Sequence, residues 1–181
     1  MIKNIEMFHG KRVMLLQGPV GPFFVRLAAD LRAAGATVFK INFNAGDWLF
    51  YPRNAINYRG TMDAWPAFLA EQLKRLRIDT VLLFGDCRPI HAAAHGVAVA
   101  HGANVGVFEE GYIRPDYITF ECCGVNGYST MSRNPADYAD SAPPAPKLNG
   151  VSGLNGGRQV RDESCTTCTL RIIGWTSIVS W

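Results

Sequence analysis

The chain has 181 residues and a mass of 19.9 kDa, and 48% of its residues are hydrophobic, which is enough apolar material for a folded core. Its 18 basic and 15 acidic residues are spread along the chain and give a net charge of +3. This composition excludes wholesale disorder. It also lacks the basic stripe with interleaved aromatic residues that is typical of nucleic-acid binders, so nucleic acid is not an expected partner.

The amino-terminal residues contain an acid and no sustained apolar segment, so no signal peptide is predicted, and no apolar stretch reaches the length of a membrane span. The five cysteines are odd in number and unevenly spaced, unlike a secreted disulfide framework. We therefore expect a cytoplasmic protein, with membrane association only at the surface.

Apolar runs alternate with segments of helical spacing. In chain order the predicted elements are a strand over 12–16, a helix from Phe23 that stops at Gly35, a strand over 37–42, a loop over 43–62, a helix capped by Asp63 and running through Arg77, a strand over 80–84, a helix from about Ile90 to His101, and a strand over 104–108. A further short strand or hairpin is predicted around 118–120.

Four strands separated by helices, with short connections and no hairpin dipeptides, predict an α/β fold with a Rossmann-like, mostly parallel sheet. Right-handed crossovers would bring the carboxyl ends of the strands to one rim, where open α/β sheets bind ligands. The composition changes after Pro146. We therefore predict a Rossmann-like unit over 1–146 and an irregular tail over 147–181, either an out-of-frame or truncated carboxyl end or a genuine short tail.

The loop after the first predicted strand contains Gln17 and Gly18 and leads into a helix. Glycine lets the backbone approach a ligand closely, and helix N-termini favour anions. The loop is neither G-x-G-x-x-G nor a Walker motif. Ligand binding and simple turn chemistry are about equally supported, because Pro22 at the helix start already explains half of the motif.

Four polar or aromatic residues lie at the end of the second predicted strand and in the loop after it: Asn42, Asn44, Asp47 and Trp48. Amides, a carboxylate and an aromatic plate are groups that bind sugars. The alternative is a loop in which the Asn and Asp side chains make local turns and Trp48 packs into the core. The cluster as a whole favours a binding site.

The third predicted strand is followed by Asp86, Arg88 and His91. The simpler interpretation makes Asp86 a helix cap, while Arg88 and His91 could bind a phosphate or carboxylate. His91 and His95 lack a third metal ligand, and the Cys165–Cys168 pair has no second pair, so no metal site is predicted.

The strongest candidate is the acidic pair Glu109 and Glu110 at the end of the fourth predicted strand, followed by Arg114. Neighbouring side chains on an extended segment point in opposite directions, so only one carboxylate is expected to enter the cleft. A partly buried carboxyl group can act as a general acid. The alternative is an ion pair with Arg114 that fixes the loop.

Several ordered motifs together resemble the bacterial capsule polysaccharide biosynthesis and export proteins, which are retaining β-Kdo glycosyltransferases. The resemblance covers roughly the first four-fifths of the chain, and its motifs are the segments at residues 16–24, 41–48, 58–60, 83–89, 108–116 and 124–127. It implies the amino-terminal, acceptor-side half of an enzyme with two Rossmann-like (GT-B-like) halves.

The resemblance further implies transfer of Kdo from CMP-Kdo to a lysophosphatidylglycerol acceptor at the cytoplasmic face of the inner membrane, in association with the capsule assembly and export machinery and without a cofactor. Glu109 would be the catalytic acid or base, and Glu110 and Arg114 would shape its loop. The family's nucleophilic carboxylate and its nucleotide site lie further downstream. A noncatalytic polysaccharide-binding or export component is the alternative function.

Overall fold

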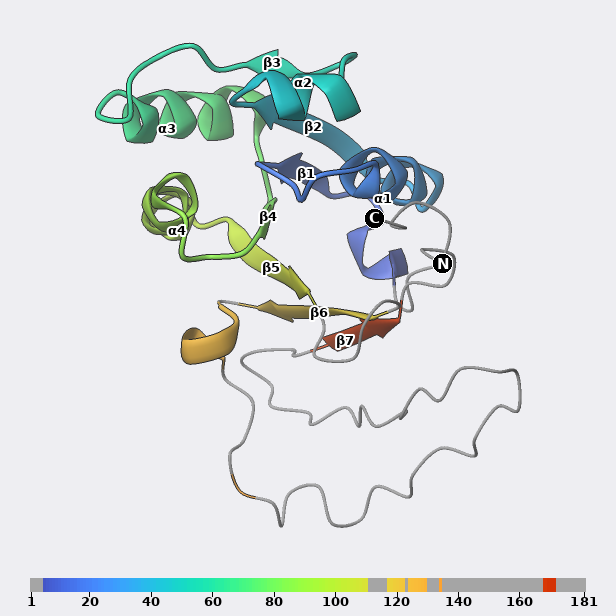
Figure 1. Cartoon of the computed structure of the whole chain (residues 1–181). Helices are drawn as coiled ribbons and strands as arrows, with labels where there is room; N and C mark the ends of the chain where they lie inside the picture. Colours follow the sequence, from blue (N-terminus) through green and yellow to red (C-terminus); the bar gives the residue numbers. More distant parts are fainter. Residues whose placement is uncertain (1–4, 111–116, 123, 130–133, 135–167, 172–181) are drawn as a thin grey trace, which may run out of the picture.

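The computed structural model describes residues 5–110, 117–122, 124–129, 134 and 168–171. They form one seven-stranded sheet in the order β3-β2-β1-β4-β5-β6-β7, with helices on both faces (Figure 1). The strands are β1 (Arg12–Leu15), β2 (Thr37–Asn42), β3 (Ile56–Asn57), β4 (Thr80–Phe84), β5 (Asn104–Glu110), β6 (Tyr117–Cys122) and β7 (Cys168–Arg171). The helices are η1 (Ile5–Phe8), α1 (Phe23–Ala33), α2 (Ala45–Phe50), α3 (Trp65–Leu76), α4 (Pro89–His101) and η2 (Asn126–Tyr128).

The strands from β1 to β5 are parallel to their neighbours, whereas β6 pairs with β5, and β7 with β6, in the antiparallel direction. The chain moves from β1 outward to β2 and β3, then returns through α3 to β4 on the other side of β1. The predicted Rossmann-like, mostly parallel sheet is confirmed. Its order reverses between β1 and β4, which is where open α/β sheets place their binding crevice.

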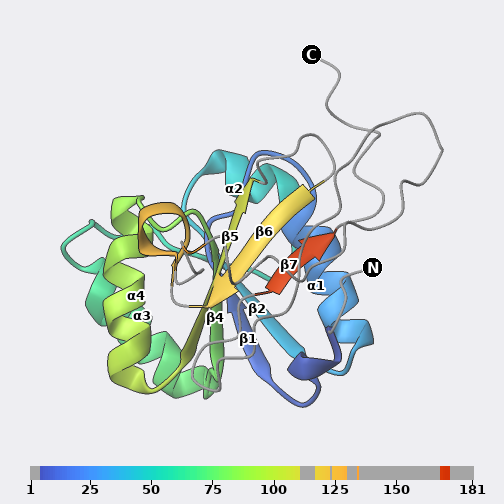
Figure 2. The same ribbon diagram turned by 90° about the horizontal axis from the view of Figure 1, so that it is seen from below.

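Two hydrophobic cores cover the two faces of the sheet. One core lies under α1 and η1 and contains aromatic residues of α1, β4, β5 and β6. The other lies under α3 and α4, where Trp65 is fully buried among leucine, isoleucine and valine side chains. Figure 2 shows α3 and α4 on one side of the sheet and α1 on the other. The central strand β4 is buried along its whole length, as its continuous apolar run predicts.

Aromatic packing fixes the end of β5 against α1. The ring of Phe108 lies 5.3 Å from that of Phe23 and 4.6 Å from that of Phe120 on β6. Removing such a buried ring costs about 3–5 kcal/mol in comparable cores. The acidic residues that follow Phe108 therefore extend from a firmly packed strand.

The predicted loop over 43–62 is wrong in part, because it contains α2 and β3. Asn44 caps α2, since its side chain accepts a hydrogen bond from the Asp47 amide at 2.9 Å, and the Asp47 carboxylate accepts one from the Phe43 amide at 3.0 Å. This reciprocal pattern resembles a capping box. The Asn-x-x-Asp spacing was therefore a readable signal for the helix.

Two predicted helix caps are also wrong. The N-cap of α3 is Ala64, without a side-chain cap, instead of Asp63. The N-cap of α4 is Arg88, and the Asp86 carboxylate accepts a hydrogen bond from the Val125 amide at 2.9 Å instead. A long-range partner has replaced the local one that the sequence suggested.

The fourth predicted strand, β5, is two residues longer than predicted and includes both glutamates. Strand β6 confirms the short strand predicted around 118–120. Of the tail expected to be irregular from residue 147, the structure describes only Cys168–Arg171, which form β7. No helix among the described residues is long and apolar enough to span a membrane.

Candidate functional site

The loops after β1 and β4 meet at the point where the strand order reverses. Gln17 follows β1 and Arg88 follows β4, and the Arg88 guanidinium donates a hydrogen bond from Nη1 to Gln17 Oε1 at 2.8 Å. These residues are 71 positions apart in the chain. The sheet topology therefore brings together two of the predicted binding residues at the carboxyl edge of the sheet.

Beside this contact lies a cavity of about 130 Å³ between the loop after β1, the start of α1, the end of β2 and helix α2. Five predicted binding residues line it: Gln17, Gly18, Asn44, Asp47 and Arg88. Asn44 and Asp47 also hold the amino-terminal end of α2 through the capping hydrogen bonds. The interpretations of a binding cluster and of local turn chemistry are therefore both supported at these two positions.

Lys40 on β2 also lines the cavity, and the sequence reasoning missed it. Its side chain is 2% exposed, and its ammonium donates a hydrogen bond to the Ile41 carbonyl and lies 3.9 Å from Asp47 Oδ1. Burial lowers the pKa of Lys40 from 10.5 to about 8, and the Asp47 carboxylate offsets part of that shift. A lysine within an apolar strand that ends at the rim was the signal that could have identified it.

Other predicted binding residues lie outside the lining of this cavity. Asn42 is buried. Its side-chain amide donates one hydrogen bond to the Tyr51 carbonyl at 2.9 Å and another to Asn57 Oδ1 at 3.3 Å. Trp48 on α2 is 54% exposed, so it is not a core residue. Gly18 lines the cavity but also has a packing role, because a Cβ there would lie 2.9 Å from the Phe24 ring.

A second group of polar residues lies at the ends of β4, β5 and β6. Glu109 is half-buried and its Oε1 accepts a hydrogen bond from the Glu110 amide at 3.2 Å, whereas Glu110 is exposed. In the β5–β6 register Glu109 lies opposite Thr119 and Glu110 opposite Ile118. The two glutamates therefore point to opposite faces, as predicted, with Glu109 on the face covered by α4. Arg114 lies outside the described residues, so its proposed ion pair stays a prediction.

The loop between β4 and α4 lies close to Glu109. Gly85 has a φ of +71°, and a Cβ there would lie 3.6 Å from Glu109 Oε2. The Cys87 thiol donates a hydrogen bond to Asp86 at 3.3 Å. That hydrogen bond, the Asp86 charge and, less strongly, Glu109 raise the pKa of the Cys87 thiol, which disfavours a thiolate nucleophile.

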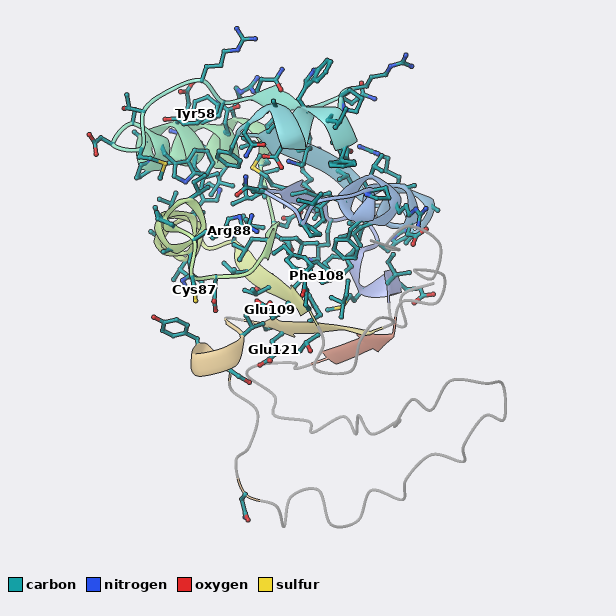
Figure 3. All side chains as sticks on the ribbon, viewed as in Figure 1. Tyr58, Cys87, Arg88, Phe108, Glu109 and Glu121 are labelled. Atoms are coloured by element: carbon teal, nitrogen blue, oxygen red, sulfur yellow. The ribbon has the colours of Figure 1, made fainter. Side chains whose placement is uncertain are left out.

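A buried carboxylate, Glu121 on β6, lies on the same face as Glu109 and was not predicted. It is 3% exposed and accepts a hydrogen bond from the Ser129 hydroxyl at 2.5 Å. Figure 3 shows Cys87 and Arg88 in the loop before α4, with Glu109 and Glu121 on the neighbouring strands. We call Asp86, Glu109 and Glu121 the acidic edge.

His91 on α4 lies between these two groups and is fully buried. The carbonyl of Gly85 can only accept, so His91 Nδ1 carries the hydrogen in this contact. Burial lowers the pKa of His91 to about 4, with smaller contributions from the Arg88 and Lys40 charges. His91 thus holds the β4–α4 loop as a neutral side chain, and the predicted role in binding an anion is not supported by its position. Among the described residues, no group of three or more potential ligands could hold a metal ion.

The sheet order, with a cavity lined by polar residues at its reversal point, defines a Rossmann-like α/β unit. Residues 79–160 match the family model of the capsule polysaccharide biosynthesis proteins. This segment begins just before β4 and includes Asp86, Arg88 and both glutamates.

Curated relatives agree with this match. The chain is 47% identical over 131 residues to the capsule polysaccharide modification protein LipB of Neisseria meningitidis serogroup A, over 71% of this chain and 31% of LipB. It is 44% identical over 131 residues to the capsule polysaccharide export protein KpsS of Escherichia coli, over 71% of this chain and 33% of KpsS. The chain therefore spans about a third of the length of these relatives. The predicted resemblance to the capsule polysaccharide biosynthesis family is confirmed over the matched part of the chain.

Proposed function

We propose that this chain is the acceptor-side unit of a retaining β-Kdo glycosyltransferase, which transfers Kdo from CMP-Kdo to a lysophosphatidylglycerol acceptor and so starts the capsule linker. The observation that supports it best is the half-buried Glu109 at the carboxyl edge of the sheet of a capsule-family chain. The unit works as a peripheral protein at the cytoplasmic face of the inner membrane, together with the capsule assembly and export machinery.

Glu109 acts as the general acid or base of the transfer. It lies at the end of β5, whose preceding residue Phe108 is packed between α1 and β6, so its backbone position is fixed. The backbone of Gly85 in the β4–α4 loop lies beside this carboxylate, at a distance where a Cβ would be in ordinary van der Waals contact with Glu109 Oε2. A fixed carboxyl group that is still open to solvent on one side can exchange a proton with a bound hydroxyl group. The nucleophilic carboxylate and the nucleotide site belong to the downstream half.

The test is a chimera in which this segment replaces the matching 131 residues of the E. coli relative. The chimera should transfer Kdo from CMP-Kdo to lysophosphatidylglycerol, and Glu109→Gln should lower kcat by about 10²–10⁴-fold, the range that loss of acid–base catalysis gives. Glu71→Gln, an exposed glutamate on α3, is the matched control and should leave transfer unchanged. A folded Glu109→Gln chimera with full turnover would remove Glu109 from the mechanism.

A noncatalytic polysaccharide-binding or export component is the second candidate, supported by the description of KpsS as an export protein. Calorimetry with the 181-residue chain separates the two. The enzyme proposal expects that the acceptor binds to this chain and that CMP-Kdo does not. It also expects the chimera to be active. The second candidate expects polysaccharide binding by the chain and a chimera that exports capsule but transfers no Kdo.

A further inference from the structure

The cavity beside the Gln17–Arg88 contact has positive groups on two of its walls. Lys40 reaches it from β2, and Arg88 reaches it from the loop after β4. Arg88 is exposed, and its guanidinium donates a hydrogen bond to the neutral amide oxygen of Gln17. A neutral partner satisfies one of its five N–H donors and leaves its charge without compensation at this contact.

The start of α1 forms a third wall, lined by Gly21, Phe24 and Val25. The N-cap of this 11-residue helix is Pro22, which offers no side-chain cap, and the first turn contains no acidic residue. The first amides of a helix need an acceptor from outside the helix and favour negative charge. An anion in the cavity would supply that acceptor.

The charges around the cavity do not cancel. Its ionisable lining residues are Lys40, Arg88, Asp47 and Tyr51. Asp47 is the one carboxylate among them, and it lies 3.9 Å from Lys40 while also accepting the Phe43 amide. The Tyr51 hydroxyl accepts a hydrogen bond from Arg32 at 2.9 Å. With Lys40 protonated, the lining has an excess of one positive charge. Burial removes water from the Lys40 ammonium, and a bound anion would offset this cost in solvation free energy.

We propose that this cavity is a phosphate subsite, in which Lys40, Arg88 and the amino-terminal amides of α1 bind the oxygens of one phosphate group. This deepens the proposed function, because it names the group that the acceptor-side unit holds. Phosphate fits better than carboxylate, because donors on three walls match a tetrahedral group, whereas the two oxygens of a carboxylate lie in one plane. A volume of about 130 Å³, against ~30 Å³ for one water in the liquid, admits a group of this size.

The test is titration of the full 181-residue chain with inorganic phosphate at pH 7.0 and constant ionic strength, set with chloride and followed by NMR shifts of the residues around the cavity. Saturable binding is expected, with shifts of the Gly21, Phe23, Phe24 and Val25 amides. Arg88→Gln should weaken it by at least tenfold, because a charge-assisted hydrogen bond is lost. Arg26→Gln, an exposed arginine on α1 outside the cavity lining, is the control and should leave binding unchanged.

Lys40→Met tests the buried cation, with its folding checked by thermal melting. Binding should weaken by at least tenfold at pH 7.0. In the wild type, loss of the Lys40 proton as the pH rises through about 8 should weaken binding. Inorganic phosphate itself becomes more negative above pH 7, because its second pKa is close to neutral, and this change alone would strengthen binding. The folded Lys40→Met variant, in which only the phosphate titrates, should therefore lack the weakening seen in the wild type. Asp47, Arg88, Tyr51 and the buried His91 are the other ionisable groups near Lys40, and His91, whose pKa is lowered to about 4 by burial, stays neutral over this range.

Two further ligands, a glycerol phosphate and acetate, test the source of the phosphate and the preference for it. A glycerol phosphate that binds more tightly than inorganic phosphate would indicate a phospholipid headgroup, and equal binding would indicate a site for free phosphate; both outcomes support the subsite. Acetate binding more tightly than phosphate would overturn it, as would an absence of saturable phosphate binding or unchanged binding in both variants. These results do not depend on Kdo transfer, so an inactive chimera with normal phosphate binding would reject only the proposed function.

Discussion

The cavity and the acidic edge lie on the same rim of one sheet but differ in charge and enclosure. The cavity collects Lys40 and Arg88 under α2, whereas the acidic edge presents Asp86 and Glu109 beside β6. The loop of residues 85–88 contributes to both. Adjacent regions of opposite charge fit the proposed transferase, in which an anionic part of a substrate would bind in one region while a carboxyl group exchanges a proton in the other.

The shared loop offers the most sensitive way to disturb both regions at once. His91 holds Gly85 and has a pKa of about 4 when folded, against 6.5 when exposed. Between these values the unfolded state binds more protons than the folded state, so the free energy of unfolding falls as the pH drops from 6.5 to 4. The contribution of neutral His91 to stability is fully present above pH 6.5. The shift corresponds to a loss of about 3 kcal/mol in the free energy of unfolding.

Urea unfolding of the wild type and His91→Gln between pH 4 and 7 measures this contribution. The variant should show a smaller loss of stability on acidification. His101→Gln, which replaces an exposed histidine at the end of the same helix, should behave like the wild type. Equal acid sensitivity in His91→Gln and the wild type would show that other groups, mainly carboxylates, account for the effect.

The strand under the acidic edge can be disturbed separately at Gly106 on β5. A Cβ there would lie 2.5 Å from the Phe120 ring and 2.7 Å from Leu82, both buried. Because Phe120 packs against Phe108, it has little room to move, and we expect Gly106→Ala to cost about 1–3 kcal/mol in stability. Thermal melting measures this as a lower Tm.

Gly96 provides the control for this substitution. It lies within α4, and a Cβ there would meet nothing within 4 Å. Gly96→Ala should raise the stability by up to about 1 kcal/mol, because alanine favours the helix. A Gly106→Ala protein that melts at or above the wild-type temperature would contradict the tight packing under the acidic edge.

The cavity side has a smaller and more local vulnerability at Asn44, the cap of α2. No residue of α2 is buried, so the cap contributes much of what holds this six-residue helix in place. Asn44→Ala should cost about 1 kcal/mol and speed hydrogen exchange at the Asp47 amide, leaving β5 unchanged. Asn104→Ala, an exposed position at the start of β5, should leave exchange in α2 unaltered. Unchanged exchange at Asp47 in Asn44→Ala would show that the cap is not needed.

Local patterns predicted most of the fold. Strands β2 and β4 have the predicted bounds, and α1, α3 and α4 begin and end within two residues of the predicted positions. Helix α2 was missed because it has no apolar stripe, although its capping residues were visible. Asp86 was assigned to a local cap, but its partner is the Val125 amide, 39 residues away.

The sequence by itself determined the alternation of strands and helices, the family resemblance and the opposite orientations of Glu109 and Glu110, because period, caps and motifs are local properties of the chain. Only the tertiary structure decided that Gln17 and Arg88 meet, that Lys40 is buried beside Asp47, and that His91 holds Gly85. These features depend on which strands become neighbours and on the loss of water around each group, and both are set when the sheet assembles.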